Sequence, residues 1–175
     1  MVLIIIDTQK LITNCNLYNF SNFLNNIQKL IDTSRKNKIE IIYIRHDDGQ
    51  NQELTKGTEG FEIYEKFKPI NDEKIFDKIV NSPFKESGLL EYLREKNETD
   101  LIIAGLQTDY CIDATVKCGF EHNFNIIVPA YCNTTIDNKF MSGKQCYEYY
   151  NNFIWPNRYA RCISLDETLE IINRN

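Results

Sequence analysis

The sequence of 175 residues is long enough to bury roughly 70% of its unfolded surface in one domain, without disulfide or metal support. Hydrophobic residues make up 42% of it and charged residues 26%, which is typical of a globular protein. The formal net charge is −5 and no basic block occurs, which argues against nucleic acid or an anionic membrane surface as a partner. We therefore expect one domain over residues 1–175.

The number and spacing of the cysteines indicate the cellular compartment. They are Cys15, Cys111, Cys118, Cys132, Cys146 and Cys162. They form no CxxC pair and no zinc-ribbon spacing, and the apolar start at residues 2–6 is too short for an export signal or a membrane span. This pattern is typical of reduced thiols, so we expect a cytoplasmic protein without a disulfide framework.

Short apolar runs alternate with segments of helical spacing along the chain. Runs typical of buried strands occur at residues 2–6, 39–44, 74–77, 101–104, 125–128 and 161–163. Helices are expected from a cap at Ser21, from a cap at Ser87, and over residues 110–122, 142–153 and 164–172. Strands separated by helices of this length indicate an α/β fold, with a mostly parallel sheet covered by helices on both faces.

The stretch LIIAGLQTDYCIDATVKCG, residues 101–119, predicts a strand, a tight turn and a helix. Cys111 is expected in the first helical turn, where unpaired N–H groups and the helix dipole favour an anion. A thiol in that position is expected to have a depressed pKa and to be nucleophilic. The alternative is that Cys111 fills the core, as most buried cysteines do.

Three ionisable residues are predicted at one edge of the sheet. Asp7 follows the first strand, Lys78 the third and Cys111 the fourth, and ligands of such sheets bind beyond the carboxyl ends of the strands. Taken singly, Asp7 could be a solvated turn residue and Lys78 a surface charge. The long polar segment at residues 46–69 is expected to supply or cover substrate contacts.

Three separated stretches carry a family resemblance: IIIDTQK, FDKIVNSPFKESGLLEYL and IIAGLQTDYCIDATVKCGFEHNFNIIVPAYCNTT. With them the chain resembles the isochorismatase-like cysteine hydrolases, which include nicotinamidases and N-carbamoylsarcosine amidase. The resemblance implies a three-layer, Rossmann-like sandwich with a six-stranded, mostly parallel sheet in the order 3-2-1-4-5-6. It also implies a catalytic triad of Asp7, Lys78 and Cys111.

The same resemblance implies a cis peptide bond between Leu106 and Gln107, which would aim the N–H groups of Gln107 and Cys111 into an oxyanion hole. The implied reaction cleaves a C–N bond of a small-molecule amide or ureido compound through a thioester on Cys111. Asp7 is suited to take the thiol proton and return it to the leaving amine, while Lys78 holds the anions by charge.

The resemblance also implies substrate contacts and an assembly. The residues that would line the substrate pocket are His46, Phe84 and Tyr110, although such side chains more often belong to the core. Members of the family suggest a homodimer or a homotetramer.

One departure from the family pattern bears on metal binding. Nicotinamidases carry an Asp-x-His motif after the second strand and a further histidine, which together bind a metal, whereas this chain has His46-Asp47-Asp48. Its other histidine, His122, is expected at the far end of the Cys111 helix. One imidazole with flexible carboxylates is a poor transition-metal site, so we expect no metal and no other cofactor. True isochorismatases lack the cysteine nucleophile, so Cys111 favours C–N cleavage.

Two alternatives stay open at this point. One is a thiol protein on the same fold that senses redox state or binds a small molecule, and the other is a metal-dependent nicotinamidase. Cys118 lies seven residues beyond Cys111, on the same helix face but too far away for a disulfide without unwinding. That spacing weakens the redox alternative.

Overall fold

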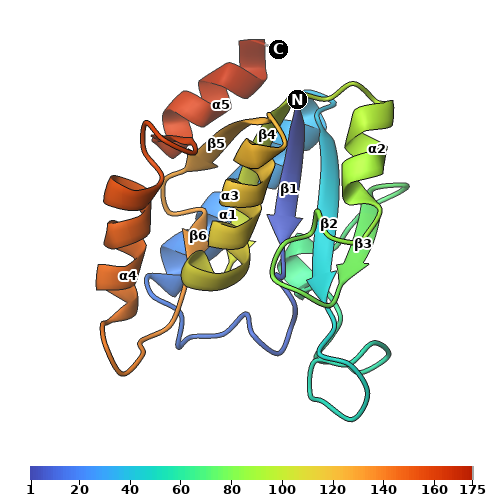
Figure 1. The fold of residues 1–175 in the computed structure, drawn as a ribbon, viewed down its shortest axis with the longest axis vertical. Helices are drawn as coiled ribbons and strands as arrows, with labels where there is room; N and C mark the ends of the chain where they lie inside the picture. The colour runs from blue at the N-terminus through green and yellow to red at the C-terminus, as the bar shows by residue number, and fades with distance from the viewer. Residues whose placement is uncertain (175) are drawn as a thin grey trace.

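A parallel sheet organises the computed structural model, which describes residues 1–174 (Figure 1). Its strands are β1 (Val2–Ile6), β2 (Glu40–His46), β3 (Lys74–Lys78), β4 (Asp100–Leu106), β5 (Asn125–Pro129), β6 (Asn133–Thr134) and β7 (Arg161–Ile163). Their order is β3-β2-β1-β4-β5-β7, and the short β6 pairs with the end of β4. With residues 161–163 as the sixth predicted strand, the expected order 3-2-1-4-5-6 is confirmed.

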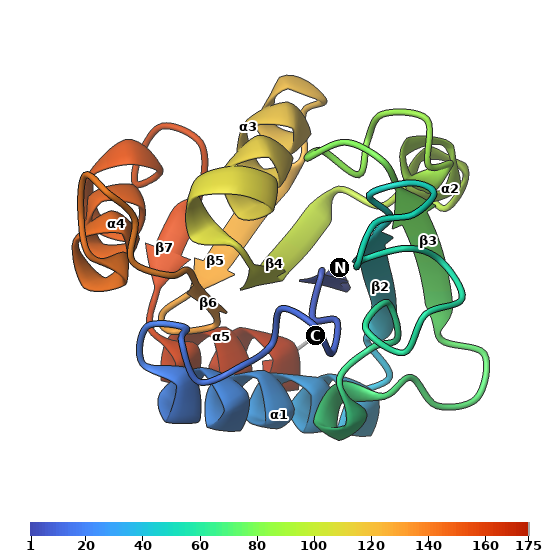
Figure 2. The ribbon, with the colours of Figure 1, turned by 90° about the horizontal axis from the view of Figure 1, so that it is seen from below.

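The helices form two layers around this sheet. They are α1 (Phe20–Lys36), α2 (Leu89–Glu95), α3 (Asp113–Glu121), α4 (Gly143–Tyr149) and α5 (Leu165–Arg174), with a 3-10 turn at Glu65–Phe67 and π-helical turns at Thr108–Ile112 and Tyr150–Ile154. Figure 2 shows α1 and α5 on one side of the sheet and α2, α3 and α4 on the other. The three-layer α/β architecture is therefore confirmed.

Strand β1 is buried on both faces because its side chains alternate between two hydrophobic cores. Leu3 and Ile5 pack with the α1 and α5 side, whereas Val2, Ile4 and Ile6 pack with the α2 and α3 side. Each is completely buried, and burying such a side chain stabilises a fold by about 1.5–3 kcal/mol. The end of β1, where the site begins, is thus held from both sides.

Two helix starts differ from the prediction. Helix α1 begins at Phe20 after Asn19, which adopts a left-handed conformation with φ 53° and makes no side-chain cap, so Ser21 does not cap it. Asparagine tolerates this conformation better than most residues. Helix α2 begins after Gly88, although the hydroxyl of Ser87 still accepts a hydrogen bond from the N–H of Leu89 at 3.1 Å.

Two other helix starts confirm the prediction. Ser142 and Gln145 form both halves of a capping box at α4. Ser164 and Glu167 do the same before α5, where each side chain accepts the other residue's N–H. Capping of this kind pairs backbone donors that would otherwise lack partners.

The segment after β2 is irregular, as expected, but it is fastened to the end of β1. The fully buried side chain of Gln9 donates to the carbonyls of His46 and Phe61, both at 3.0 Å, and accepts from the N–H of His46 at 2.8 Å. Gln9 therefore joins the start and the middle of this segment to the strand that precedes the site.

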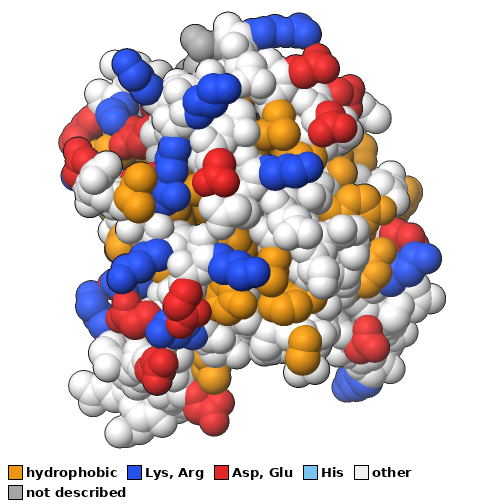
Figure 3. Space-filling model, turned by 180° about the vertical axis from the view of Figure 1, so that it is seen from behind, with side chains coloured by type: hydrophobic (Ala, Val, Ile, Leu, Met, Phe, Trp, Pro, Cys, Tyr) orange, Lys and Arg blue, Asp and Glu red, His pale blue; other side chains and the backbone are white. Residues whose placement is uncertain are grey.

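The surface carries charges of both signs. Figure 3 shows Lys and Arg interspersed with Asp and Glu, and with scattered hydrophobic side chains, on the face behind the view of Figure 1. All six cysteines are free. Within residues 1–174, no helix combines the length and the apolar character needed to cross a membrane.

Candidate active site

The carboxyl ends of β1, β3 and β4 bring three predicted residues together. Asp7 follows β1, Lys78 is the last residue of β3, and Cys111 lies in the π-helical turn after β4. The Nζ atom of Lys78 is 2.7 Å from Asp7 Oδ2 and 3.2 Å from Cys111 Sγ. Asp7 and Lys78 are each 2% exposed and Cys111 is 8% exposed. The group is therefore nearly withdrawn from solvent, which strengthens its electrostatic interactions.

The second carboxylate oxygen of Asp7 has no hydrogen-bond partner. Among residues 1–174, the other buried side-chain oxygens in this state are the hydroxyls of Thr13 and Ser34, so Asp7 Oδ1 is the only carboxylate oxygen among them. Leaving a buried acceptor unpaired costs free energy, more so for a charged group. An acceptor is thus available beside the thiol of Cys111.

His46 extends the group through a contact with Lys78. Its Nδ1 lies 2.9 Å from Lys78 Nζ, and its Nε2 lies 3.1 Å from Asp48 Oδ1. An ammonium can only donate, so Nδ1 accepts and the proton of the neutral imidazole is assigned to Nε2, which donates to Asp48. His46 was expected to contact substrate; it lines the pocket and also holds the ammonium of Lys78.

The predicted depressed pKa of Cys111 is wrong. Burial raises the pKa of the Cys111 thiol to about 12, and the charge of Asp7 acts in the same direction, while Lys78 acts against both. Burial also raises the pKa of Asp7, again with Lys78 in opposition. The thiol sits in a π-helical turn ahead of α3, where desolvation outweighs the helix dipole. The resting thiol is protonated and needs a base.

A hollow of about 280 Å³ opens onto this group. Its lining residues are Asp7, Ile12, His46, Asp48, Leu54, Asn81, Gln107, Tyr110 and Cys111. Asp48 and Leu54 come from the segment after β2, which was expected to supply or cover substrate contacts. Tyr110, an expected substrate contact, is 55% exposed and stands at the rim.

Asn81 is a site residue that the sequence reasoning missed. Its Oδ1 lies 3.7 Å from Cys111 Sγ, within reach of the thiol as a weak donor. It follows β3 by three positions, inside the stretch that contains Lys78. The sequence signal that could have identified Asn81 is its position just after β3, the strand that ends at Lys78.

Phe84 does not line this hollow, which corrects the expectation of a substrate contact. Its ring stacks on Phe124 and packs against His122, with both pairs of ring centroids 5.6 Å apart. Gly119 of α3 makes room for it, since a Cβ there would lie 3.3 Å from the Phe84 ring and 2.9 Å from Ile126. Phe84 belongs to the core between the sheet and α3, and we no longer assign it to the site.

The turn that carries Cys111 is fixed by Gln107. The peptide bond between Leu106 and Gln107 is cis, as the family resemblance implied. The carbonyl of Gln107 accepts from the N–H groups of Tyr110 and Ile112, each at 3.1 Å. These bonds orient the Gln107 peptide relative to the nucleophile.

Asp7, His46 and Cys111 are also side chains of the kinds that bind metal ions. Asp7, His46 and Cys111 each offer a ligand atom within 4.8 Å of the others. However, the Nζ atom of Lys78 lies within 3.2 Å of all three side chains, so an ammonium already stands among them. A divalent cation would be repelled by it and would find one imidazole only. This donor set does not fit a metal ion.

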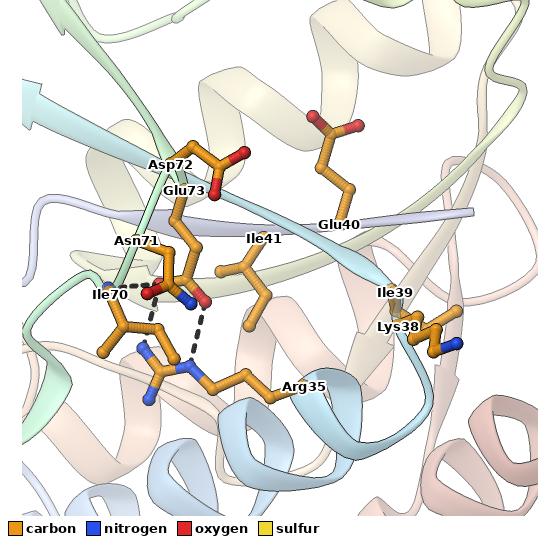
Figure 4. A pocket seen from close by; sticks show the side chains of 9 residues that line it. All are labelled: Arg35, Lys38, Ile39, Glu40, Ile41, Ile70, Asn71, Asp72 and Glu73. Atoms are coloured by element: carbon orange, nitrogen blue, oxygen red, sulfur yellow. Dashed lines mark hydrogen bonds and ion pairs between the residues drawn. The ribbon is translucent and has the colours of Figure 1, made fainter.

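A larger hollow, of about 500 Å³, lies at the opposite ends of β2 and β3 (Figure 4). Its lining residues are Arg35, Lys38, Ile39, Glu40, Ile41, Ile70, Asn71, Asp72 and Glu73. Figure 4 shows Arg35 reaching Glu73, and its Nε and Nη2 donate to the two carboxylate oxygens, both at 2.9 Å. None of the lining residues is a cysteine, serine or histidine, so this hollow is not the candidate site.

Fold and site together define a class: doubly wound α/β proteins with a cysteine, an aspartate and a lysine grouped at the carboxyl edge of the sheet. Comparison with known proteins identifies the family within this class. The family model described as Isochorismatase domain matches residues 1–144. The uncharacterized isochorismatase family protein YrdC of Bacillus subtilis is 34% identical over 126 residues, which cover 70% of this chain and 67% of YrdC. The chain belongs to the isochorismatase family of hydrolases.

Solved structures share the fold. A putative hydrolase of the isochorismatase family from Chromobacterium violaceum matches with a TM-score of 0.92 at 21% identity, over 99% of this chain and 94% of that one. A cysteine hydrolase from Pseudomonas syringae pv. phaseolicola matches with a TM-score of 0.90, also at 21% identity, over 99% and 92% of the two chains.

Proposed function

We propose that this protein is a cysteine hydrolase that cleaves the C–N bond of a small amide or ureido compound through a thioester on Cys111. One observation carries the proposal: the unpaired Oδ1 of Asp7 sits in the same buried group as the protonated thiol, with Lys78 bridging them through bonds of 2.7 and 3.2 Å. A buried base beside a nucleophile is the arrangement that nucleophilic catalysis requires.

In the first step, Asp7 takes the proton of the Cys111 thiol as Sγ attacks the carbonyl carbon. The S–C bond forms while the π electrons of the carbonyl move onto its oxygen. Because burial raises the pKa of Asp7, its carboxylate is a stronger base than one in water and, once protonated, a usable acid. The ammonium of Lys78 compensates for negative charge throughout.

The oxyanion would be held by the backbone N–H groups of Gln107 and Cys111. Gln107 and Cys111 both line the hollow, and the two hydrogen bonds to the Gln107 carbonyl hold the turn between them, which supports this assignment. A donor of this kind contributes about 3 kcal/mol to the transition state. Asp7 then returns its proton to the leaving nitrogen as the C–N bond breaks, and the thioester remains on Cys111.

Hydrolysis of the thioester completes the cycle. Water attacks the thioester carbonyl while Asp7 removes a proton from it, and the second tetrahedral intermediate expels the Cys111 thiolate. The thiolate regains a proton from Asp7, and the product acid leaves. In this scheme His46 is a positioning residue, since it touches the Lys78 ammonium at 2.9 Å and is itself held by Asp48.

The raised pKa of Cys111 counts against the redox alternative, because peroxide reacts with a thiolate and burial keeps this thiol protonated. The nicotinamidase alternative depends on a metal, which the ammonium of Lys78 disfavours. Assembly as a homodimer or homotetramer and a cytoplasmic location remain predictions of the sequence.

A screen of small amides, carbamoyl compounds and nicotinamide for ammonia release tests the proposal. Each compound is assayed with and without a chelator, and with a Cys111→Ala variant in parallel. We expect ammonia that depends on Cys111 and survives chelation. Loss of activity on chelation would favour the nicotinamidase alternative, and ammonia from none of the compounds would contradict the proposed hydrolase.

A further inference from the structure

The hollow over Cys111 has negative charges in its wall and no free cation. Asp7 and Asp48 are among its lining residues, and none of those lining residues is Lys or Arg. The ammonium of Lys78 lies beneath, with a side chain that is 0% exposed and contacts to Asp7, His46 and Cys111. A ligand in the hollow meets carboxylates without meeting an available positive charge.

Asp48 is the carboxylate that a ligand can reach. Its Oδ1 accepts from His46 Nε2 at 3.1 Å, and its side chain is 48% exposed. Its backbone is fixed, because its N–H donates to the carbonyl of Leu54 at 3.0 Å. The hollow is also lined by the apolar or aromatic side chains of Ile12, Leu54 and Tyr110 and by the uncharged amides Asn81 and Gln107.

Cations on neighbouring segments are engaged elsewhere. Lys56 pairs with Asp77 at 2.7 Å, and Arg45 pairs with the same carboxylate at 2.8 Å. Lys10 pairs with Glu65 at 2.9 Å. These pairs lie outside the lining of the hollow, and Lys78 is paired with Asp7, so the charge of Asp48 has no lysine or arginine partner in the hollow.

We propose that the site selects its substrate by charge: it accepts neutral or cationic amides, disfavours amides that carry a carboxylate, and uses Asp48 as the specificity-determining residue. The inference rests on the proposed hydrolase function. In a hollow of about 280 Å³, a ligand lies close to both carboxylates, well inside the screening length of about 8 Å at physiological ionic strength. Like charges at such separations oppose binding.

Alkylation of Cys111 tests this charge selection without a substrate. Three reagents of similar size differ in charge: iodoacetamide is neutral, iodoacetate is anionic and 2-bromoethylammonium is cationic. Rates are measured by peptide mapping at Cys111 and at Cys15, which is exposed and serves as the internal reference. The ratio of two reagents at one thiol cancels the reactivity of that thiol.

We expect the iodoacetamide-to-iodoacetate ratio to be at least about tenfold higher at Cys111 than at Cys15, a factor that corresponds to about 1.4 kcal/mol. The 2-bromoethylammonium-to-iodoacetate ratio should be shifted in the same direction. Equal ratios at the two thiols would overturn the proposal.

A matched pair of variants separates Asp48 from net charge. Asp48→Asn keeps an oxygen that can accept from His46 and removes the charge, so the ratio at Cys111 should fall by about three- to tenfold. Asp47→Asn makes the same change of charge one residue away, where Oδ1 accepts from the N–H of Gly49 at 2.9 Å and the side chain is outside the hollow. It should leave the ratio unchanged. Equal effects of both variants would overturn the role of Asp48.

Three amides with the same four-carbon chain separate a failure of this proposal from a failure of the proposed function. Butanamide, succinamate and 4-aminobutanamide are compared by ammonia release. We expect succinamate to be the poorest of the three by kcat/KM. Cleavage of succinamate as fast as butanamide would overturn the charge selection and leave the hydrolase standing. Ammonia from none would contradict the hydrolase, while the alkylation ratios would still decide the charge selection.

Discussion

Two ion pairs at opposite ends of the sheet differ in how completely their carboxylates are paired. At the end where β3 begins, both oxygens of Glu73 accept from Arg35, and Oε2 also accepts from the N–H of Ile70 at 2.9 Å (Figure 4). At the end where β3 finishes, Asp7 uses one oxygen for Lys78 and leaves the other without a partner. The two pairs flank the same strand and yet are built differently.

The difference indicates different roles. Arg35 also donates to the carbonyl of Lys68 and to the hydroxyl of Tyr43, so its pair connects α1 with β2 and the segment before β3. Every strong acceptor there is used, which is typical of a stabilising contact. The unpaired oxygen of Asp7 costs stability and sits beside a nucleophile, which is typical of a functional site.

The largest expected effect on kcat comes from removing the negative charge of the Asp7 carboxylate. Asp7→Asn keeps the shape of the side chain but removes the base, so kcat should fall by about 10²–10⁴. The control is Glu73→Gln, the same chemical change in the saturated pair, which should leave kcat near the wild-type value. Ammonia release on the best substrate measures both. A Glu73→Gln loss equal to that of Asp7→Asn would contradict the comparison.

Lys78→Ala should be about as harmful as Asp7→Asn. It leaves the carboxylate of Asp7 buried without its counter-charge, and breaking such a pair typically costs about 3–5 kcal/mol of stability. Because the two residues act as one unit, the double variant should have a kcat little below that of either single variant. Steady-state kinetics measures kcat, and circular dichroism shows whether each variant is folded. Additive losses of kcat in folded variants would contradict a single catalytic unit.

Arg35→Met should have the reverse profile. Removing the guanidinium leaves the carboxylate of Glu73, whose side chain is 13% exposed, without its charged donors. Hydrogen bonds to charged groups contribute about 1.5–3 kcal/mol, so the free energy of unfolding in urea should fall by that amount. The kcat of the folded fraction should not change. A kcat loss without a stability loss would show that this end of the sheet is coupled to the site.

The raised pKa of Cys111 predicts a pH dependence of stability. The thiol has a pKa of about 12 in the fold and 9.0 in the unfolded chain, so the unfolded state loses its proton first as the pH rises. Stability from this group is complete below pH 9 and declines between 9 and 12. Relative to Cys111→Ser, the wild type should lose about 2 kcal/mol of unfolding free energy halfway through that window.

Parallel urea titrations of the wild type and Cys111→Ser, one near neutral pH and one within that alkaline window, measure this effect. The comparison with Cys111→Ser is needed because burial raises the pKa of other thiols as well, including those of Cys146 and Cys162. A difference between the two proteins that does not change with pH would contradict the raised pKa.

The smallest expected effect concerns the outer part of the site. His46→Ala removes the acceptor that holds the Lys78 ammonium, and kcat should fall by about tenfold with little change in KM. His46→Asn restores an acceptor close to the Nδ1 position and should recover part of the loss. If His46 had a purely structural role, His46→Ala and His46→Asn would lower the stability alike, and His46→Asn would not recover kcat. A rise in KM alone would indicate a substrate contact instead.

The sequence predicted what depends on strand order and position. Asp7, Lys78 and Cys111 each stand at the carboxyl end of a strand, and parallel strands bring those ends to one edge whatever the side chains do. The continuous apolar run of β1 similarly predicted a strand buried on both faces. These inferences depend on chain connectivity alone.

The sequence could not predict what depends on three-dimensional surroundings. Burial raises the pKa of Cys111 and the adjacent charge of Asp7 adds to it, and neither surrounding is visible in the sequence. The bond from Lys78 to His46 requires the neighbouring strands to be in register, which pairs these two residues in β2 and β3. Phe84 was assigned by resemblance, and its place in the core is set by the space at Gly119.

Mass spectrometry of the rapidly quenched reaction tests the central claim most directly. With an amide that is turned over, the peptide containing Cys111 should carry the mass of the acyl group during turnover. The adduct should disappear on treatment with hydroxylamine and should be absent in Cys111→Ala, which should also release no ammonia. Turnover without an adduct on Cys111, or ammonia release retained in Cys111→Ala, would contradict a thioester mechanism at this site.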